Sequence, residues 1–261
     1  MKKLIIPILV VVSTLVSCSG QFNAERALAG TMMAAQAMTI SDAQIQSYVH
    51  QYIEKLDASS RVLPASNAYS KRLAKLTSGL TAVGGVPLNF KVYQTSDVNA
   101  FACADGSVRV YTGIMDLMTD AELLGVIGHE IGHVALKHTK KQMKSAMLRA
   151  AAMEGLASTS DLAATLTNSQ LGAIGEALMD AKFSRKQETE ADDFGYEFLK
   201  GAGKNPWAMA MSFEKLQSIS ASGGRQSAIV NNLFSSHPDV AARIERMSAR
   251  ATQEGYKRPS K

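Results

Sequence analysis

The chain has 261 residues, of which 46% are hydrophobic and 20% charged, and its formal net charge is +5. This composition is that of a globular protein with a sizeable core, and it excludes a largely disordered chain. The basic residues are scattered and form no stripe with aromatic residues, so no nucleic-acid partner is expected.

The N-terminus has the pattern of a secretory signal. Lys2 and Lys3 precede an uncharged stretch over residues 4–16. This stretch is too short to remain in a bilayer as a permanent spanning helix. We therefore expect residues 1–17 to be a signal peptide that is removed.

The end of this signal resembles the lipobox of bacterial lipoproteins. The sequence LVSC occupies residues 15–18, and in such proteins the cysteine, here Cys18, is acylated after cleavage. Ser19 follows where lipoproteins of the inner membrane usually have Asp, so the resemblance implies an outer-membrane lipoprotein that faces the periplasm. Residues 18–40 are then expected to be a lipid-anchored tether with a weak helix. The alternative is an ordinary signal peptide with an incidental cysteine.

Sequence periodicity predicts one mainly helical α+β domain over residues 41–261, with a small antiparallel sheet. Ser41 and Gln44 form a capping-box pattern, which predicts that a helix begins there. Alternation over residues 88–95 predicts a strand, and residues 99–113 are typical of a β-hairpin. The expected helices cover residues 41–57, 67–80, 119–138, 140–157, 169–180, 184–200, 206–219 and 239–251.

A helix with two histidines carries the clearest chemical pattern. Thr119 and Glu122 form a second capping box just before an apolar run. His129 and His133 then lie one turn apart on one helix face, where both can bind a Zn²⁺ ion at about 2.0–2.1 Å. Glu130 lies beside them and can take a proton from water whose pKa the metal lowers towards 7. This HExxH pattern is an established metalloprotease signature.

The alternative for this helix is a buried core helix whose histidines have no metal. Two buried imidazoles and a carboxylate would then need polar partners inside the core, which is costly. A catalytic zinc site also needs a third protein ligand. His138 is close in sequence but lies on a different helix face from His133, and the metzincin spacing is absent.

The better third ligand comes from residues 184–200. Glu188 and Asp192 are four residues apart and share a helix face, so Glu188 could bind the metal while Asp192 accepts the free N–H of a ligand histidine. Glu190 is turned by about 200° from Glu188, and its replacement is expected to be nearly silent. A solvated acidic helix face is the alternative interpretation of this stretch.

Together, HExxH and the later ETEAD sequence resemble the gluzincin peptidases of the CAAX prenyl protease and HtpX type, which have a zincin-like fold. The similarity extends to NAFA at 99–102 and SHPDVAARI at 236–244, and it covers most of residues 60–250. Among these families the chain is most similar to the LoiP-like outer-membrane lipoprotein proteases. The resemblance implies one zinc ion held by His129, His133 and Glu188, with Glu130 as the general base.

Further roles follow from the resemblance alone. His237 would stabilise the oxyanion or occupy the open metal position at rest, although a His-Pro pair is often only a turn. Arg243 would brace the site against Asp192 or Asp97, or simply be an exposed helix arginine. The NAFA residues would form the edge strand that binds an extended substrate, or would only be part of the sheet. These residues are Asn99, Ala100, Phe101 and Ala102.

These features predict a zinc endopeptidase for unfolded or misassembled envelope proteins, in protein quality control at the outer membrane, with contact to outer-membrane assembly machinery. Prenylated proteins are not expected as substrates, because the spanning helices of the membrane-embedded relatives are missing. The alternative is a non-catalytic chaperone or assembly factor with a structural or occluded zinc. Glu130 favours catalysis, because a purely structural zinc site has no use for it.

Overall fold

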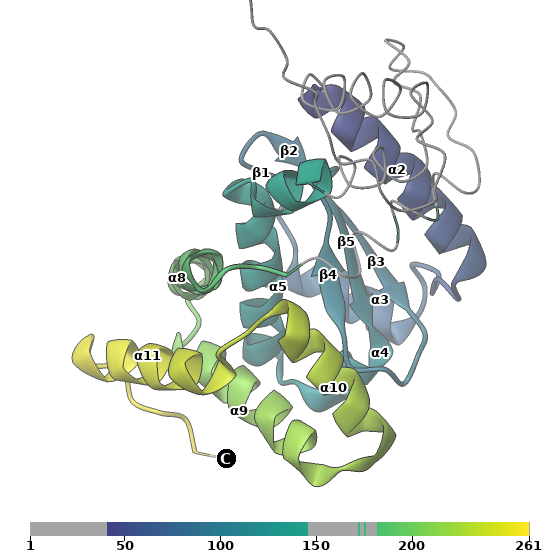
Figure 1. The fold of residues 1–261 in the computed structure, drawn as a ribbon. Helices are drawn as coiled ribbons and strands as arrows, with labels where there is room; N and C mark the ends of the chain where they lie inside the picture. Colours follow the sequence, from purple (N-terminus) through teal and green to yellow (C-terminus); the bar gives the residue numbers. More distant parts are fainter. Residues whose placement is uncertain (1–40, 146–171, 173–174, 176–181, 261) are drawn as a thin grey trace, which may run out of the picture.

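The computed structural model describes residues 41–145, 172, 175 and 182–260. The expected signal peptide and tether lie outside these ranges, as do most of the helices expected over 140–157 and 169–180. Figure 1 shows the arrangement: helix α5 (Asp120–Ala135), which carries His129 and His133, lies between the sheet and helix α8 (Arg185–Gly201). Within the described ranges, no helix combines the length and the apolar character needed to cross a membrane.

The first described helix is α2 (Asp42–Ser59), which begins where the sequence predicts. The side chain of Ser41 accepts a hydrogen bond from the backbone of Gln44, and the Gln44 side chain accepts one from Ser41. The apolar face of α2 is buried, with Ile45 and Val49 almost inaccessible to solvent. Helix α3 (Ala68–Leu76) follows and is shorter than expected.

The main sheet has the strand order β3-β5-β4, with β3 at Asn89–Tyr93, β4 at Ala100–Ala102 and β5 at Ser107–Tyr111. The expected strand and hairpin are both present. However, β3 pairs with β5 in parallel, so the sheet is mixed rather than wholly antiparallel. Side-chain alternation predicts a strand but not its direction, because both pairings show the same two-residue period. A separate antiparallel ribbon joins β1 (Ala82–Val83) to β2 (Val86–Pro87).

A buried ion pair attaches α2 to this sheet. Arg109 on β5 is 2% exposed, and its Nε and Nη2 donate to the two oxygens of Asp57 at 2.8 and 2.9 Å. Burial alone would raise the pKa of Asp57, but hydrogen bonds from Arg109, Lys91 and Tyr93 outweigh it and lower this pKa to about 2. Removing one partner of such a pair costs about 3–5 kcal/mol, so the contact fixes α2 beside the strands.

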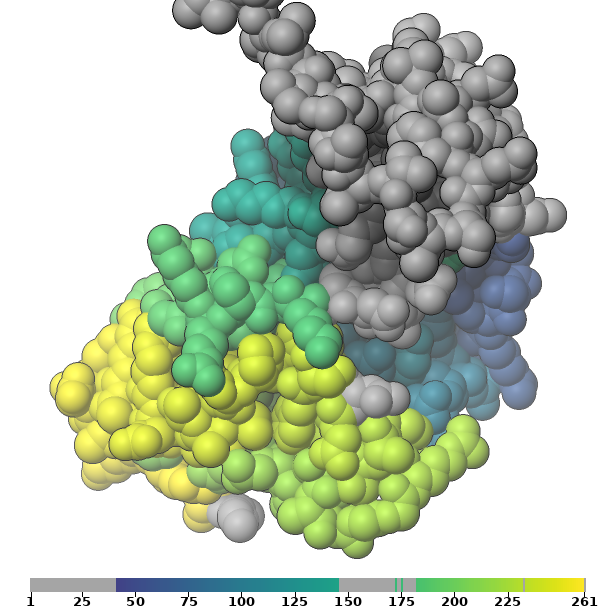
Figure 2. All heavy atoms as spheres, viewed as in Figure 1, coloured from purple at the N-terminus to yellow at the C-terminus, as the bar shows by residue number. Residues whose placement is uncertain are grey.

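Helix α4 (Thr112–Leu117) leads into α5 (Asp120–Ala135), whose capping box at Thr119 and Glu122 is formed as predicted. Four helices lie in the last described range, residues 182–260. They are α8 (Arg185–Gly201), α9 (Trp207–Ser222), α10 (Gly224–Ser236) and α11 (Val240–Gln253). In the space-filling view these helices, green to yellow, form one contiguous part of the visible face (Figure 2).

Helix α10 is absent from the sequence prediction. The pair Gly223 and Gly224 indicates a loop, and both residues do adopt positive φ, at 76° and 84°. That turn separates α9 from α10, but the chain returns at once to helix and buries Val230 completely. His237 directly follows α10 as its C-cap and lies close to α5.

Glycines allow α5 and α8 to approach closely. A Cβ atom on Gly128 would lie 2.7 Å from the ring of Phe198 and 3.1 Å from the Cα of Gly195. A Cβ atom on Gly195 would in turn lie 3.0 Å from the backbone nitrogen of His129. Because neither position has a side chain, the two backbones meet directly, and this brings the start of α8 to the histidine face of α5.

Candidate metal centre

Two imidazoles on α5 form one side of the site. The Nε2 atoms of His129 and His133 are 3.1 Å apart, as their four-residue spacing on a helix predicts. Both rings are buried, with exposures of 4% and 0%. The predicted pair of donors is therefore formed inside the protein rather than on its surface.

Glu188, in the first turn of α8, faces this pair. Its Oε1 lies 3.3 Å from Nε2 of His133, and its Oε2 lies 3.7 Å from Nε2 of His129. The capping box at Ser184 and Gln187 begins α8 just before Glu188 and so sets the direction of the side chain.

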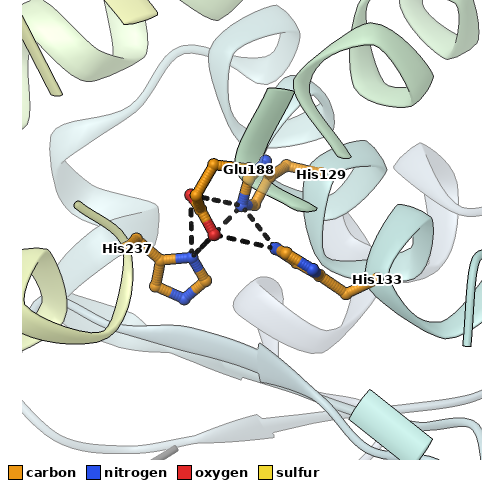
Figure 3. A group of neighbouring side chains, drawn as sticks. All are labelled: His129, His133, Glu188 and His237. Carbon is orange, nitrogen blue, oxygen red and sulfur yellow. Dashed lines mark hydrogen bonds and ion pairs between the residues drawn. The ribbon is translucent and has the colours of Figure 1, made fainter. Parts of the chain in front are cut away.

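His237 completes the group from the end of α10. Its Nδ1 lies 3.1 Å from Oε1 of Glu188 and 3.3 Å from Nε2 of His129. Figure 3 shows the four side chains pointing towards one another, from α5, from α8 and from the residue that directly follows α10. One donor atom from each of them lies within 4.8 Å of every other.

These separations fit one zinc ion. Zinc is bound by His and carboxylate ligands at about 2.0–2.2 Å in a tetrahedron, whose donor atoms are then about 3.3–3.6 Å apart. The separations between the donor atoms of these four residues given above, from 3.1 to 3.7 Å, are close to that spacing. The buried imidazole and carboxylate donors are also those that zinc prefers.

Comparison with known proteins agrees with this geometry. Residues 64–251 match the family described as Peptidase family M48. The chain belongs to peptidase family M48. It is 40% identical to Metalloprotease LoiP of Escherichia coli strain K12 over 247 residues, and these residues cover 94% of this chain and 96% of that protein. It is also 40% identical over 251 residues to Metalloprotease YcaL of the same strain, covering 95% and 96%.

A more distant relative is the Beta-barrel assembly-enhancing protease of Escherichia coli strain K12. It is 24% identical over 264 residues, which cover 97% of this chain but 53% of that protein. The family and the cluster together confirm the predicted zinc metallopeptidase. The zinc-binding group of this M48 peptidase consists of His129, His133 and Glu188.

A buried carboxylate supports one ligand of the M48 zinc group. Oδ1 of Asp192 lies 2.9 Å from Nδ1 of His129, and Arg243 donates to both oxygens of Asp192, at 2.8 and 2.6 Å. Arg243 also lies 2.6 Å from Oε2 of Glu188. Of the two partners expected for Arg243, the structure has Asp192. Asp97 instead lies 3.5 Å from Arg225.

Burial and charge decide the ionisation of these groups. Burial alone would raise the pKa of Glu188, but the hydrogen bonds of His133 and His237 hold it well below its ordinary value. Burial also opposes the charge of Asp192, and Arg243 outweighs it, so the pKa of Asp192 is lowered. Burial lowers the pKa of His133 well below its ordinary value, which keeps this imidazole neutral as a metal ligand must be.

The second histidine of the motif has different surroundings, which the sequence analysis missed. Nδ1 of His133 lies 3.1 Å from Nδ1 of His138, whose Nε2 lies 3.0 Å from Oε2 of Glu190. Phe183 stacks on the His133 ring, with centroids 3.7 Å apart. His138 and Glu190 are not among the four donors, but Glu190 is not remote from the site as the helix faces alone suggested. The sequence signal that could have indicated this role is the second glutamate of ETEAD, Glu190, two residues after the ligand Glu188.

A cleft of about 320 Å³ opens beside the zinc group. Glu130 and His237 line it together with Asn99, Phe101 and Ala102, three of the four residues expected to bind substrate. The fourth, Ala100, lines an adjoining small cavity with Glu130 and His237. The structure thus brings the expected general base and the expected substrate strand to one place.

Proposed function

We propose that this M48 peptidase is an endopeptidase for unfolded or misassembled envelope proteins, in protein quality control at the outer membrane. The observation that carries this proposal is the edge strand β4, which borders an apolar cleft next to the zinc group. Its lining includes Leu56, Phe101, Phe183, Ile229 and Leu233. An unfolded chain offers what such a cleft recognises, namely extended backbone and uncovered apolar side chains, whereas a folded protein hides both.

The pairing of β4 leaves one edge for a substrate. The oxygen of Asn99 accepts from Tyr111, and the nitrogen of Cys103 donates to Ser107, so these residues face β5. In an antiparallel pair, the alternate residues direct their backbone groups to the other side. Ala100 and Ala102 therefore direct their N–H and C=O groups to the other edge of β4, with which no strand of the described residues pairs. An extended substrate can add there as a further strand without a sequence requirement.

The roles in hydrolysis follow from what each residue faces. A bound zinc ion would supply a Lewis acid that lowers the pKa of water and polarises the carbonyl of the scissile bond. Glu130 lines the cleft at the metal and accepts the proton of the attacking water, then donates it to the leaving amine. His237, the fourth donor of the group, would have to withdraw from a bound zinc ion when substrate binds, because a catalytic zinc keeps one position open.

The chaperone alternative also has an observation in its favour. Four protein donors, with His237 as the fourth, form the closed set that is typical of structural zinc. Glu130 argues against it, because a structural site does not need an acid in the cleft beside the metal. The two functions differ in whether the bound protein is cut.

Degradation of a permanently unfolded protein separates the two functions. We expect the solubilised full-length chain to cleave a reduced and alkylated protein but to spare the same protein when folded. A chelator should stop the cleavage and added zinc should restore it. Suppressed aggregation without cleavage, in the presence of zinc, would instead establish the chaperone function.

We also propose that Cys18 carries the lipid that holds residues 41–261, through the tether 18–40, on the periplasmic side of the outer membrane. One more distant relative is named for enhancing β-barrel assembly, which supports this location and makes outer-membrane assembly machinery the proposed partner. Each buried methylene of an acyl chain contributes about 0.8 kcal/mol to anchoring. The variant Cys18→Ala should therefore leave the outer-membrane fraction. Its retention there would rule out the lipid as the main anchor.

A further inference from the structure

The two zinc-binding histidines of α5 have unequal support. Nδ1 of His129 meets a carboxylate directly, that of Asp192 at 2.9 Å. Nδ1 of His133 meets no carboxylate but a second imidazole, that of His138 at 3.1 Å. His138 in turn contacts Glu190 through its other nitrogen at 3.0 Å. The second histidine thus reaches a carboxylate through one intervening ring.

A sharp turn brings His138 behind His133. Helix α5 ends at Ala135, with Leu136 as its C-cap, and Lys137 adopts the left-handed conformation with φ of 60°, which non-glycine residues rarely do. Residues 138–145 then form a new helix after this turn. His138 is 2% exposed, so its ring is enclosed rather than free to turn in solvent. The Glu190 side chain, at 41% exposed, closes this line of contacts at the surface.

Only one arrangement of protons allows His133 to bind zinc through the atom that faces the other donors. With Nε2 of His133 on the metal, its Nδ1 carries the proton and donates to Nδ1 of His138. Nε2 of His138 then carries a proton and donates to the carboxylate of Glu190. The opposite arrangement would protonate Nε2 of His133 and remove its lone pair from the metal.

We infer that His138 and Glu190 are positioning residues for His133, which fix its tautomer and ring orientation and thereby raise the affinity of the site for zinc. This inference rests on the zinc ligation described above and adds two residues to it. Partners of this kind typically change metal affinity or activity by about 10–100-fold when they are lost. Neither residue lines the substrate cleft, so their effect is expected on the metal first.

The test measures the zinc dissociation constant of the full-length chain by competition with a chromophoric chelator. We expect His138→Leu to weaken zinc binding by about 10–100-fold. His138→Asn should recover part of this loss, because its Oδ1 can accept from Nδ1 of His133 near the position of the lost nitrogen. Glu190→Ala should weaken binding by less than His138→Leu, and Glu190→Gln by less again, since it keeps an acceptor.

Two controls match these variants. Lys186→Ala removes the other ionic partner of Glu190, at 3.8 Å, without touching His138. His50→Ala removes the one histidine of the chain outside the site. Both should bind zinc like the wild type. Thermal unfolding of the metal-free proteins shows whether a variant has only lost stability. If His138→Leu does not fold, Glu190→Ala still tests the inference, because the Glu190 side chain is partly exposed and its loss is expected to leave the fold intact.

Zinc affinity within twofold of the wild type in both His138→Leu and Glu190→Ala would overturn the inference. Equal losses in His138→Leu and His138→Asn, with none in Glu190→Ala, would also overturn it, because they would show that the ring merely fills space. Failure of the wild type to bind zinc would overturn the ligation itself and the inference with it, and this outcome is separate from the others.

Discussion

Replacing Glu130 with glutamine should abolish proteolysis while zinc stays bound and the fold stays intact. The amide has nearly the shape of the carboxylate, but it cannot accept the proton of the attacking water. Glu130 is 6% exposed and lines the cleft beside the zinc group, so bulk water does not readily replace it as a base. Removing a general base costs about 10²–10⁴-fold in rate.

The measurement is turnover of an unfolded protein by purified Glu130→Gln, together with its zinc content and thermal unfolding. Glu197→Gln, an exposed position on α8 away from the cleft, is the matched control and should keep full activity. Near-normal turnover by Glu130→Gln with bound zinc would show that another group accepts the proton.

Replacing Glu188 with alanine should weaken zinc binding severely and remove activity. The change deletes one ligand, and it also leaves the guanidinium of Arg243, 2.6 Å from the lost carboxylate, facing the metal position. The buried charge of Arg243 then has Asp192 as its remaining carboxylate partner in the site, so more positive charge faces the two histidines and opposes the binding of a cation. Both effects act in the same direction.

The measurement is the zinc stoichiometry of purified Glu188→Ala under a competing chelator, compared with that of variants at neighbouring residues of the site. Asp192→Ala should lose about 10–100-fold in affinity, because it supports His129 without binding metal. His237→Ala should keep its zinc, because the three remaining ligands are the number that catalytic sites use. If Glu188→Ala keeps the metal while Glu190→Ala loses it, the third ligand has been assigned to the wrong residue.

The sequence by itself determined the local parts of this site. His129 and His133 share a face because an α-helix repeats every 3.6 residues, and the same rule pairs Glu188 with Asp192. Capping boxes at Ser41, Thr119 and Ser184 set where three helices begin, since each box needs only residues three apart. Such contacts lie within one element, so their geometry follows from the spacing of residues.

Tertiary structure decided what lies between elements. The parallel pairing of β3 with β5 and the position of His237 after α10 join residues whose spacing carries no geometric signal. The same is true of the contact between His138 and Glu190, which are 52 positions apart. Glycines at 128 and 195 set how closely α5 and α8 approach, and therefore whether Glu188 reaches the histidines at all. The physical reason is that contacts between elements depend on how whole surfaces pack, whereas a helical face depends on one repeat.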